Sequence, residues 1–228
     1  MFSVIIPTLL KPSSLFALVD KLIQTAIVGE IIIINNSLSP IQFNFPKVIV
    51  YTPSENIYVN PAWNLGVSMS KYNLICLCND DINFDVNIFS LVCKKLERND
   101  VSIIGPDSSC FNYELLNFKF KTKSSYVRNY GYGTLMFLKK SSYVKIPDNL
   151  KIWCGDDFLF HSQKNRNYVF SGIKIFTEMS VTSNRKEFDF IKMYDIDNYP
   201  FKYFSPYLKK YRFEYKLLRL FGLRCINV

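Results

Sequence analysis

Two pairs of adjacent aspartates are the side chains in this sequence most able to do chemistry. The first pair, Asp80-Asp81, follows Asn79 directly after an apolar run, Leu74–Cys78. Two neighbouring carboxylates repel each other unless something positive lies between them, and their hard oxygen atoms suit Mg²⁺ or Mn²⁺ that bridges to phosphate. The alternative is a turn, because Asn-Asp-Asp is ordinary turn chemistry. Taken alone, this pair favours the turn.

The second pair, Asp156-Asp157, follows Trp153 and lies directly before three apolar residues, Phe158 to Phe160. This order is typical of the first turn of a helix. Acidic side chains are favoured there by the helix dipole, so helix capping explains the pair without any chemistry. The other explanation is a carboxylate that accepts a proton during a reaction. The presence of both pairs in one chain favours the chemical explanation.

Apolar runs that alternate with amphipathic segments predict the elements that must position these pairs. The predicted strands are Ser3–Ile6, Ile31–Ile34, Val48–Tyr51, Leu74–Cys78, Val101–Ile104, Thr134–Leu138 and Tyr168–Phe176. The predicted helices run from Pro12–Ser14 to a stop at Gly29, from an Asn60 cap to Met69, from an Asp85 cap to Leu96, and onward from about Asp156. Strands that alternate with helices predict a mostly parallel sheet in an α/β fold. An exposed strand is also expected over Asn117–Lys121, and no clear period follows Arg185.

The carboxyl ends of the strands are where an open parallel sheet binds its ligands. Three of the predicted strands end in residues that could meet a ligand there, namely Pro7 and Thr8, then Asn35, Asn36 and Ser37, and then Asn79, Asp80 and Asp81. Amide, hydroxyl and carboxylate groups are the hydrogen-bond partners that a base and a ribose need, whereas a diphosphate needs a cation. We therefore expect a nucleotide site with a metal ion at this edge.

Length and composition fit one globular α/β domain, with 228 residues of which 49% are hydrophobic and 21% charged. The net charge of +9 favours an anionic partner, such as a nucleotide, a nucleic acid or an anionic lipid surface. The six cysteines show no C-x-x-C spacing, which indicates buried free thiols rather than zinc ligands. Pro7 interrupts the first apolar run, and no run approaches the ~20 apolar residues of a membrane helix. We therefore expect a cytoplasmic protein, and peripheral contact with a membrane stays open.

From Ser3 to about Val181 the sequence resembles the GT-A glycosyltransferases of family 2 and their relatives. The matching segments, in chain order, are Ser3–Thr8, Ile34–Ser37, Asn56 with Ala62–Gly66, Asn79–Asp81 and Gly155–Asp157. Asn79–Asp81 stands where the family has its D-x-D motif. Gly155–Asp157 stands where the family has the E-D pair that supplies the catalytic base. Each motif is weak singly, but their order and spacing together are fairly specific.

The resemblance implies a single GT-A domain over residues 1–182, with a mostly parallel sheet flanked by helices. Beyond it, residues 183–228 form a basic, aromatic extension that we expect to pack on that domain. It also implies an enzyme that moves a hexose or deoxyhexose from a nucleotide-sugar, with UDP as the favoured nucleotide, onto a hydroxyl of a glycan or lipid-linked acceptor. The implied reaction is an inverting single displacement with Mn²⁺ or Mg²⁺ as cofactor.

The roles implied by the resemblance fall on named positions. Asp157 is the expected general base, with Asp156 as the alternative, and Asp81 is the expected metal ligand. The residues expected beside the nucleotide-sugar are Pro7, Thr8, Asn35, Asn36, Asn56, Asn64, Asn79 and Asp80. Trp153 could stack on an acceptor sugar or pack in the core, and Gly133 could let an acceptor approach the backbone or simply form a turn.

Two departures from the family pattern bear on these roles. Asn79 replaces the first aspartate of the D-x-D motif, so it can hydrogen-bond a ribose or sugar but brings no charge, and metal binding falls chiefly on Asp81. Asp156 replaces the glutamate of the E-D pair, which leaves open whether Asp156 or Asp157 faces the acceptor. Asn79 also leaves open an inactive, sugar-binding relative.

The basic and aromatic tail from Tyr203 to Arg224 has two explanations. It could lie on an anionic membrane, or it could pack on the domain. We expect packing, because four aromatic side chains are costly to leave in water, namely Tyr207, Tyr211, Phe213 and Phe221.

Two other classes of function compete with sugar transfer. A nucleic-acid-binding module is suggested by the positive charge, but the chain has no recognised motif for it and its acidic pairs would repel phosphate without a metal. A sugar-nucleotide pyrophosphorylase would need a glycine-rich loop after the first strand, and Thr8–Pro12 has no glycine. We therefore expect no nucleic-acid partner.

Overall fold

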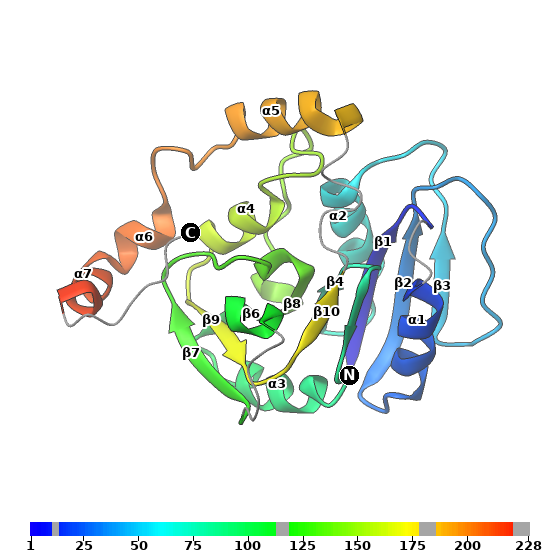
Figure 1. Cartoon of the computed structure of the whole chain (residues 1–228), viewed down its shortest axis with the longest axis horizontal. Coiled ribbons are helices and arrows are strands. Elements are labelled where there is room, and N and C mark those ends of the chain that lie inside the picture. The colour runs from blue at the N-terminus through cyan, green and yellow to red at the C-terminus, as the bar shows by residue number, and fades with distance from the viewer. Residues whose placement is uncertain (11–13, 113–118, 178–185, 221–228) are drawn as a thin grey trace.

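The computed structural model describes residues 1–10, 14–112, 119–177 and 186–220, which are arranged around a large central sheet (Figure 1). Within these residues the sheet has eight strands in the order β3-β2-β1-β4-β8-β6-β9-β7, and a second sheet pairs β10 with β5. The strands are β1 (Phe2–Thr8), β2 (Val28–Asn35), β3 (Val48–Tyr51), β4 (Leu74–Cys78), β5 (Ile82–Phe84), β6 (Val101–Pro106), β7 (Lys121–Ser125), β8 (Leu135–Lys139), β9 (Arg166–Ser171) and β10 (Ile175–Thr177).

The first half of the sheet, β3-β2-β1-β4, is parallel throughout. Every residue of β1 is buried, because layers of side chains cover both faces of the strand. Val4 and Ile6 belong to the core on one face and Ile5 to the core on the other, as alternation along a strand requires. The interior strands β1, β2 and β4 are mostly buried and have continuous apolar sequences, whereas the edge strand β3 is half-buried. All four predicted strands are confirmed.

In the second half of the sheet, β8 lies between β4 and β6 and runs antiparallel to both. Leu135, where β8 begins, therefore pairs with Cys78, where β4 ends. β6 and β9 pair in parallel, and β7 is antiparallel to β9. The sheet is thus mostly parallel, with β8 and β7 reversed among its eight described strands. The inserted β8 places the turn that precedes it beside the residues that follow β4.

Helices cover both faces of the sheet (Figure 1). α1 and α3 pack on one face, where Leu18 and Phe89 are buried. α2, α4 and α6 pack on the other face, where Trp63, Leu159 and Tyr207 are buried. The helices are α1 (Ser14–Gln24), α2 (Val59–Met69), α3 (Ile88–Leu96), α4 (Gly155–His161), α5 (Asp189–Asp197), α6 (Pro206–Lys210) and α7 (Arg212–Leu220). The predicted α/β class is confirmed.

Three predicted helix boundaries are wrong. Gly29 does not end a helix, because it lies in β2, where the Tyr72 ring is so close that a β-carbon on Gly29 would be 2.3 Å from it. Asn60 is no cap, because it lies inside α2, and Tyr58 precedes that helix with a φ of 66°. Asp85 lies in the turn before α3, where its carboxylate accepts the N–H of Asn87.

Two predicted strands are also shifted. The strand predicted over Tyr168–Phe176 is two strands, β9 and β10, because Gly172 turns the chain between them with a φ of 88°. The exposed strand expected at Asn117–Lys121 begins only at Lys121, as β7. The start of the predicted strand, and the residues Pro12 and Ser13 predicted to open α1, lie outside the described residues.

The C-terminal segment contacts the domain through α5, α6 and α7. Tyr207 is fully buried, donates its hydroxyl hydrogen to the Ser125 carbonyl at 2.8 Å and accepts the Asn167 N–H at 2.9 Å. Tyr211 is buried beside it, but Phe213 is 77% exposed, so the expectation that Phe213 is covered is wrong. Phe221 and the expected boundary at residues 182 and 183 lie outside the described ranges.

No helix in the described part of the chain is both long enough and apolar enough to span a membrane.

Candidate functional site

The first acidic pair lies directly after β4, where several elements meet. The Thr8 hydroxyl, at the end of β1, donates to Asp80 Oδ2 at 2.5 Å, and the Ser14 hydroxyl, at the start of α1, donates to the Asp80 carbonyl at 3.1 Å. The Thr177 hydroxyl, at the end of β10, donates to Asp81 Oδ2 at 3.2 Å. The structure therefore brings the predicted residues Thr8, Asp80 and Asp81 together.

The environment of Asp80 makes its negative charge costly. Burial raises the pKa of Asp80 to about 6, the hydrogen bond from Thr8 opposes this rise, and the charge of Asp81 adds to it. A cation beside the pair would relieve the repulsion between the two carboxylates.

A divalent ion fits this pair only if substrate atoms complete its coordination. Across the described ranges, no group of three or more His, Cys, Asp and Glu side chains could hold a metal ion. Mg²⁺ and ions like it are commonly held by one or two carboxylates, with phosphate oxygens and water as the remaining ligands. Asp80 and Asp81 supply this donor set, so the chain fits an ion that binds together with a nucleotide.

Asn35 and Asn36 hold the loop after β2 in place. The buried Asn35 amide donates to the Ser39 carbonyl at 2.7 Å, and its oxygen accepts both the N–H and the hydroxyl of Ser37. The Asn36 N–H donates to the Thr8 carbonyl at 2.8 Å, which ties this loop to the end of β1 that carries Pro7. Both asparagines thus lie at the predicted edge of the sheet with the first acidic pair.

The loop before α2 is tied to the same edge. Asn36 accepts the Ile57 N–H and donates to the Tyr58 carbonyl, both at 3.2 Å. Asn56 accepts the Tyr58 N–H at 2.9 Å and so supports the left-handed backbone at Tyr58. Asn56 therefore lies in a loop that is tied through Asn36 to the edge carrying the first acidic pair.

Asn64 has a different set of contacts. Its side chain donates to the Ile146 carbonyl at 2.9 Å, accepts the Ile146 N–H at 2.9 Å and accepts the Tyr143 hydroxyl at 2.8 Å. These bonds fix the segment before α4 to α2. The structure does not bring the Asn64 side chain together with the other predicted donor-site residues.

The second acidic pair, in the first turn of α4, binds Arg128. Arg128 Nε lies 2.6 Å from Asp157 Oδ1, and Nη1 lies 3.3 Å from Asp156 Oδ2. The three side chains are only 20–32% exposed, so solvent screens their charges weakly. Burial raises the pKa of Asp157 to about 6 and the charge of Asp156 adds to the rise, while Arg128 opposes it. A carboxylate with this pKa is ionised at neutral pH and can still accept a proton.

The 3-10 turn η2 (Tyr132–Thr134) lies between the two acidic pairs. The Asn79 N–H, next to the first pair, donates to the Thr134 carbonyl at 2.9 Å. On the other side, a β-carbon on Gly133 would lie 2.9 Å from Asp156 Oδ2, so glycine allows the close approach. Through Asn79 and Gly133, η2 thus links the two acidic pairs. The first pair has oxygen atoms that suit a cation, and the second contains a carboxylate that can accept a proton. We call these two pairs and the turn between them the acidic edge.

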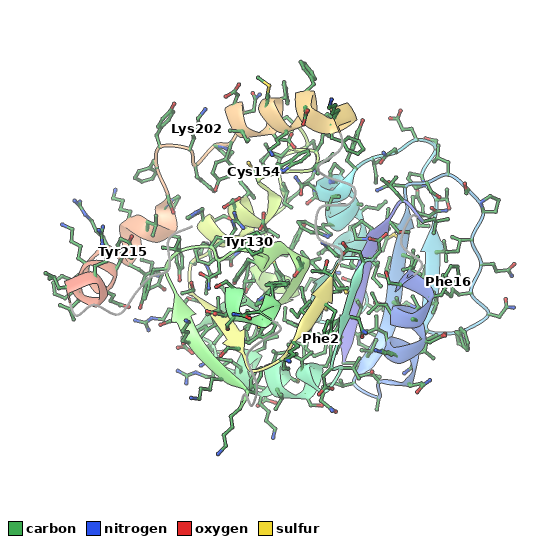
Figure 2. All side chains as sticks on the ribbon, viewed as in Figure 1. Phe2, Phe16, Tyr130, Cys154, Lys202 and Tyr215 are labelled. Carbon is green, nitrogen blue, oxygen red and sulfur yellow. The ribbon has the colours of Figure 1, made fainter. Side chains whose placement is uncertain are left out.

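Trp153 lies in the loop that leads into α4. Its ring is partly exposed, and Lys192 Nζ lies 5.6 Å from the ring centroid. Asn60 donates to the Trp153 carbonyl at 3.0 Å. Cys154 follows with a left-handed φ of 61°, and in Figure 2 it lies just below α5. A partly exposed indole next to the second acidic pair can contact a bound sugar.

His161 is a packing residue of α4. Its Nδ1 lies 2.7 Å from the Ser205 hydroxyl, and its ring contacts Phe160. Burial lowers the pKa of His161 to about 4, with the nearby charge of Arg128 contributing, so the ring is neutral at physiological pH.

Sequence reasoning missed Arg128, because it lies in an irregular segment after the strand expected at Asn117–Lys121. In the same segment Asn129 donates to Asp107 Oδ2 at 3.2 Å, and Lys123 pairs with Asp107 at 2.9 Å. These bonds anchor the chain on both sides of η1 (Ser108–Phe111). A lone arginine before a glycine-rich turn is the only signal, and it is a weak one.

Comparison with known sequences gives no relative, because no protein-family model and no curated protein matches the chain. Solved structures do match. S. aureus TarS 1-349 is 15% identical, with a TM-score of 0.57 over 74% of this chain and 57% of that chain. GalNAc-T7 with UDP, GalNAc and Mn²⁺ is 13% identical, with a TM-score of 0.60 over 78% of this chain and 43% of that chain. TarS 1-349 in complex with UDP is 12% identical, with a TM-score of 0.54.

The chain therefore spans less than two thirds of the length of these neighbours. At such low identity the likeness is one of fold. Both neighbours are glycosyltransferases of the GT-A type, and the central sheet and flanking helices described above match them. The chain has the GT-A fold.

Proposed function

We propose that the chain is a glycosyltransferase that moves a sugar from a UDP-sugar to a hydroxyl group of a glycan or lipid-linked acceptor, with a divalent ion and with inversion. The observation that carries the proposal is the acidic edge. It holds a carboxylate pair whose oxygen atoms suit a cation and, across one turn, a carboxylate with a raised pKa. Transfer from a nucleotide diphosphate needs both functions at separate places.

The donor half of the proposed site is the edge formed by β1, β2 and β4. Pro7 and Thr8 end β1, Asn35 ends β2 with Asn36 directly after it, and Asn56 supports the loop before α2. We place the base and ribose against these residues and the diphosphate at Asn79, Asp80 and Asp81. GalNAc-T7 was crystallised with UDP and Mn²⁺, and TarS with UDP and with UDP-GlcNAc, which supports UDP as the nucleotide and a divalent ion as cofactor.

In the proposed reaction, the acceptor oxygen forms a bond to the anomeric carbon as the bond from that carbon to the diphosphate oxygen breaks. Attack from the face opposite the leaving group inverts the anomeric configuration. Asp157 accepts the proton of the acceptor hydroxyl, with Asp156 as the alternative base. When bound at Asp81, the ion supplies positive charge for the departing diphosphate.

Arg128 keeps the proposed base ionised. Its guanidinium favours the charged form of Asp157, against the effects of burial and of Asp156. Burial and Asp156 raise the pKa of Asp157 and Arg128 lowers it, which together give a value of about 6. With this pKa the carboxylate is ionised at pH 7 and is still basic enough to take a proton in the transition state.

The acceptor half of the site is proposed around Trp153 and Gly133. Trp153 can stack on the apolar face of a sugar, and Gly133 lets the Asp156 side chain lie directly against the backbone of η2. Both residues lie next to the second acidic pair, and the acceptor hydroxyl must lie there for Asp157 to accept its proton.

The outward face of α7 fits an anionic lipid surface, and we propose it as the membrane contact of the enzyme. Phe213, Leu217 and Leu220 share one face of α7 and are 77%, 44% and 82% exposed. Arg212, Lys216 and Arg219 are exposed on the same helix. An apolar stripe with basic neighbours binds the boundary of an anionic bilayer. The buried Tyr207 and Tyr211 anchor this part of the tail to the domain.

The test of the proposed activity is a screen of UDP-, GDP- and dTDP-sugars with Mn²⁺, in which release of nucleotide diphosphate is measured with and without acceptor glycans. We expect UDP-sugar turnover in the wild type and loss of ~10²–10⁴-fold in rate for Asp157→Asn. Asp148→Asn, an exposed aspartate paired with Lys145, is the matched control and should keep full activity. Equal turnover in Asp157→Asn and wild type, with Asp156→Asn also active, would show that the second pair is only a helix cap.

A further inference from the structure

The loop that carries Trp153 is bound by a buried carboxylate from the C-terminal segment. Asp195 of α5 is fully buried, and its two oxygens accept three consecutive backbone N–H groups. Oδ1 accepts from Lys151 at 2.9 Å, and Oδ2 accepts from Ile152 at 2.8 Å and from Trp153 at 2.9 Å. Bonds from backbone N–H groups to a carboxylate are among the strong ones. Three of them on one side chain fix the course of this loop.

The opposite side of the same loop is bound by α2. The Asn60 N–H donates to the Lys151 carbonyl at 2.9 Å, and the Asn60 amide donates to the Trp153 carbonyl at 3.0 Å. A β-carbon on Gly155 would lie 1.9 Å from Asn60 Oδ1, so the start of α4 also packs directly on Asn60. The loop is therefore held between Asn60 and Asp195 over residues 151–155.

The loop ends where the proposed base begins. Cys154 adopts a left-handed conformation with φ 61° and ψ 5°, and α4 starts at the next residue with Asp156 and Asp157 in its first turn. A non-glycine residue in this conformation persists only where the surroundings hold it. A change in the path of residues 151–153 would therefore change the position of the second acidic pair relative to Arg128.

We propose that Asp195 is a positioning residue for the acceptor half of the site, through which α5 orders the Trp153 loop and sets the place of Asp157. The enzyme is then incomplete without its C-terminal segment, although Asp195 itself touches no reacting atom. Tyr199, two residues after α5, supports this assignment, because it contributes a buried hydroxyl whose pKa is raised first by burial and then by the charge of Asp157.

The test is Asp195→Asn. In either orientation of the asparagine side chain, its NH₂ group replaces one of the two oxygens and faces a backbone N–H, so at least one of the hydrogen bonds is lost. Asp197→Asn is the matched control on the same helix, where the aspartate is exposed and paired with Lys202. The inference rests on the proposed function, so the first readout is independent of activity. In hydrogen exchange, the amides of residues 151–153 should be protected in the wild type and in Asp197→Asn, and should exchange roughly tenfold to hundredfold faster in Asp195→Asn.

A second readout without activity uses the two tryptophans of the chain. In protein labelled with 5-fluorotryptophan, Asp195→Asn should shift or broaden the ¹⁹F resonance of Trp153 and leave that of the core residue Trp63 unchanged. If the exchange rates and the Trp153 resonance of Asp195→Asn equal those of Asp197→Asn, the positioning role is wrong, whatever the activity of the protein.

The kinetic readout separates positioning from general stability. With an active donor, kcat of Asp195→Asn should fall roughly tenfold to hundredfold, because small displacements of catalytic groups cost that much. UDP affinity and donor KM should stay within about twofold, since the donor residues lie on other elements. A loss of UDP affinity equal to the loss of kcat would overturn the proposal, since it would indicate damage to the whole fold. Absence of turnover in the wild type would contradict the proposed function, while the exchange and ¹⁹F results would still decide the role of Asp195.

Discussion

The ion pair between Arg128 and the second acidic pair gives a prediction about the pH dependence of catalysis. Arg128→Met removes the guanidinium and keeps a long unbranched side chain. Burial and the charge of Asp156 then act on Asp157 without opposition, so the pKa of Asp157 should rise above its value of about 6. The base must be ionised to act, and the acidic limb of the kcat profile should therefore move to higher pH.

The size of this shift follows from the geometry. An opposite charge within hydrogen-bonding distance lowers the pKa of a carboxyl group by roughly 1–3 units. Arg128 and Asp157 are 32% and 28% exposed, so we take the lower part of that range, roughly 1–1.5 units. The ionised fraction of Asp157 at about pH 6 would then fall roughly tenfold, and the fraction at about pH 8.5 would recover almost fully.

The assay is kcat at saturating donor and acceptor across the pH range in which the protein stays folded. Arg128→Lys keeps a positive charge and should show a smaller shift, and Arg98→Met, which removes an exposed arginine paired with Asp100, should show none. The reasoning is refuted if Arg128→Met lowers kcat by the same factor at every pH. That result would assign Arg128 to substrate binding rather than to the ionisation of Asp157.

Three further predictions concern other parts of the molecule. Burial raises the pKa of Asp80 to about 6 in the folded protein, so its ionised form lowers the stability of the fold above that pH. Asp80→Asn should therefore raise the Tm of the metal-free protein by roughly 2–5 °C at about pH 7.5, as measured by scanning calorimetry. This gain in Tm should shrink as the pH falls towards about 4. Gly133→Ala places a methyl group 2.9 Å from Asp156 Oδ2, so it should lower kcat roughly tenfold with little change in UDP affinity; an unchanged kcat would show that the close approach has no catalytic consequence. The double variant Phe213→Glu, Leu217→Glu should abolish sedimentation with anionic lipid vesicles and leave Tm unchanged, whereas wild-type binding should weaken as salt rises; binding that is equal in both proteins would exclude α7 as the contact.

The parallel half of the fold is predictable from the sequence because its interior strands, β1, β2 and β4, are buried on both faces. Such strands are continuous apolar runs, and the residues that follow them must lie at one edge of the sheet. This is why the sequence alone predicts that Thr8, Asn36 and Asp80 lie at one edge of the sheet. The antiparallel β8 is also a continuous apolar run. Such a run predicts a buried strand but does not show whether the strand is parallel or antiparallel to its neighbours.

The contacts that complete the site come from segments without periodicity. Arg128 lies in an irregular stretch, and Asp195 lies in a tail whose composition is basic and aromatic. Both act through hydrogen bonds to residues more than 25 positions away, such as Asp157 and Trp153, and local sequence does not encode such pairings. Asn60 is a further case of a long-range contact that the local sequence does not show. Asparagine is typical of helix caps, but the Asn60 side chain binds the distant loop at Trp153 instead.

Calorimetric titration of UDP tests the central claim most directly, because it measures the nucleotide and ion site without any knowledge of the sugar or the acceptor. We predict that the wild type binds UDP more tightly with Mn²⁺ than with a chelator, that Asp81→Ala loses this difference, and that Asp85→Ala, which changes an exposed aspartate on the turn after β5, keeps it. An oligonucleotide titrated at two salt concentrations should bind weakly and lose affinity steeply with salt, as expected for nonspecific attraction to a chain of net charge +9. Equal UDP affinity in wild type and Asp81→Ala, with and without Mn²⁺, or no UDP binding together with tight and salt-resistant binding of the oligonucleotide, would contradict a metal-dependent nucleotide-sugar site at the end of β4.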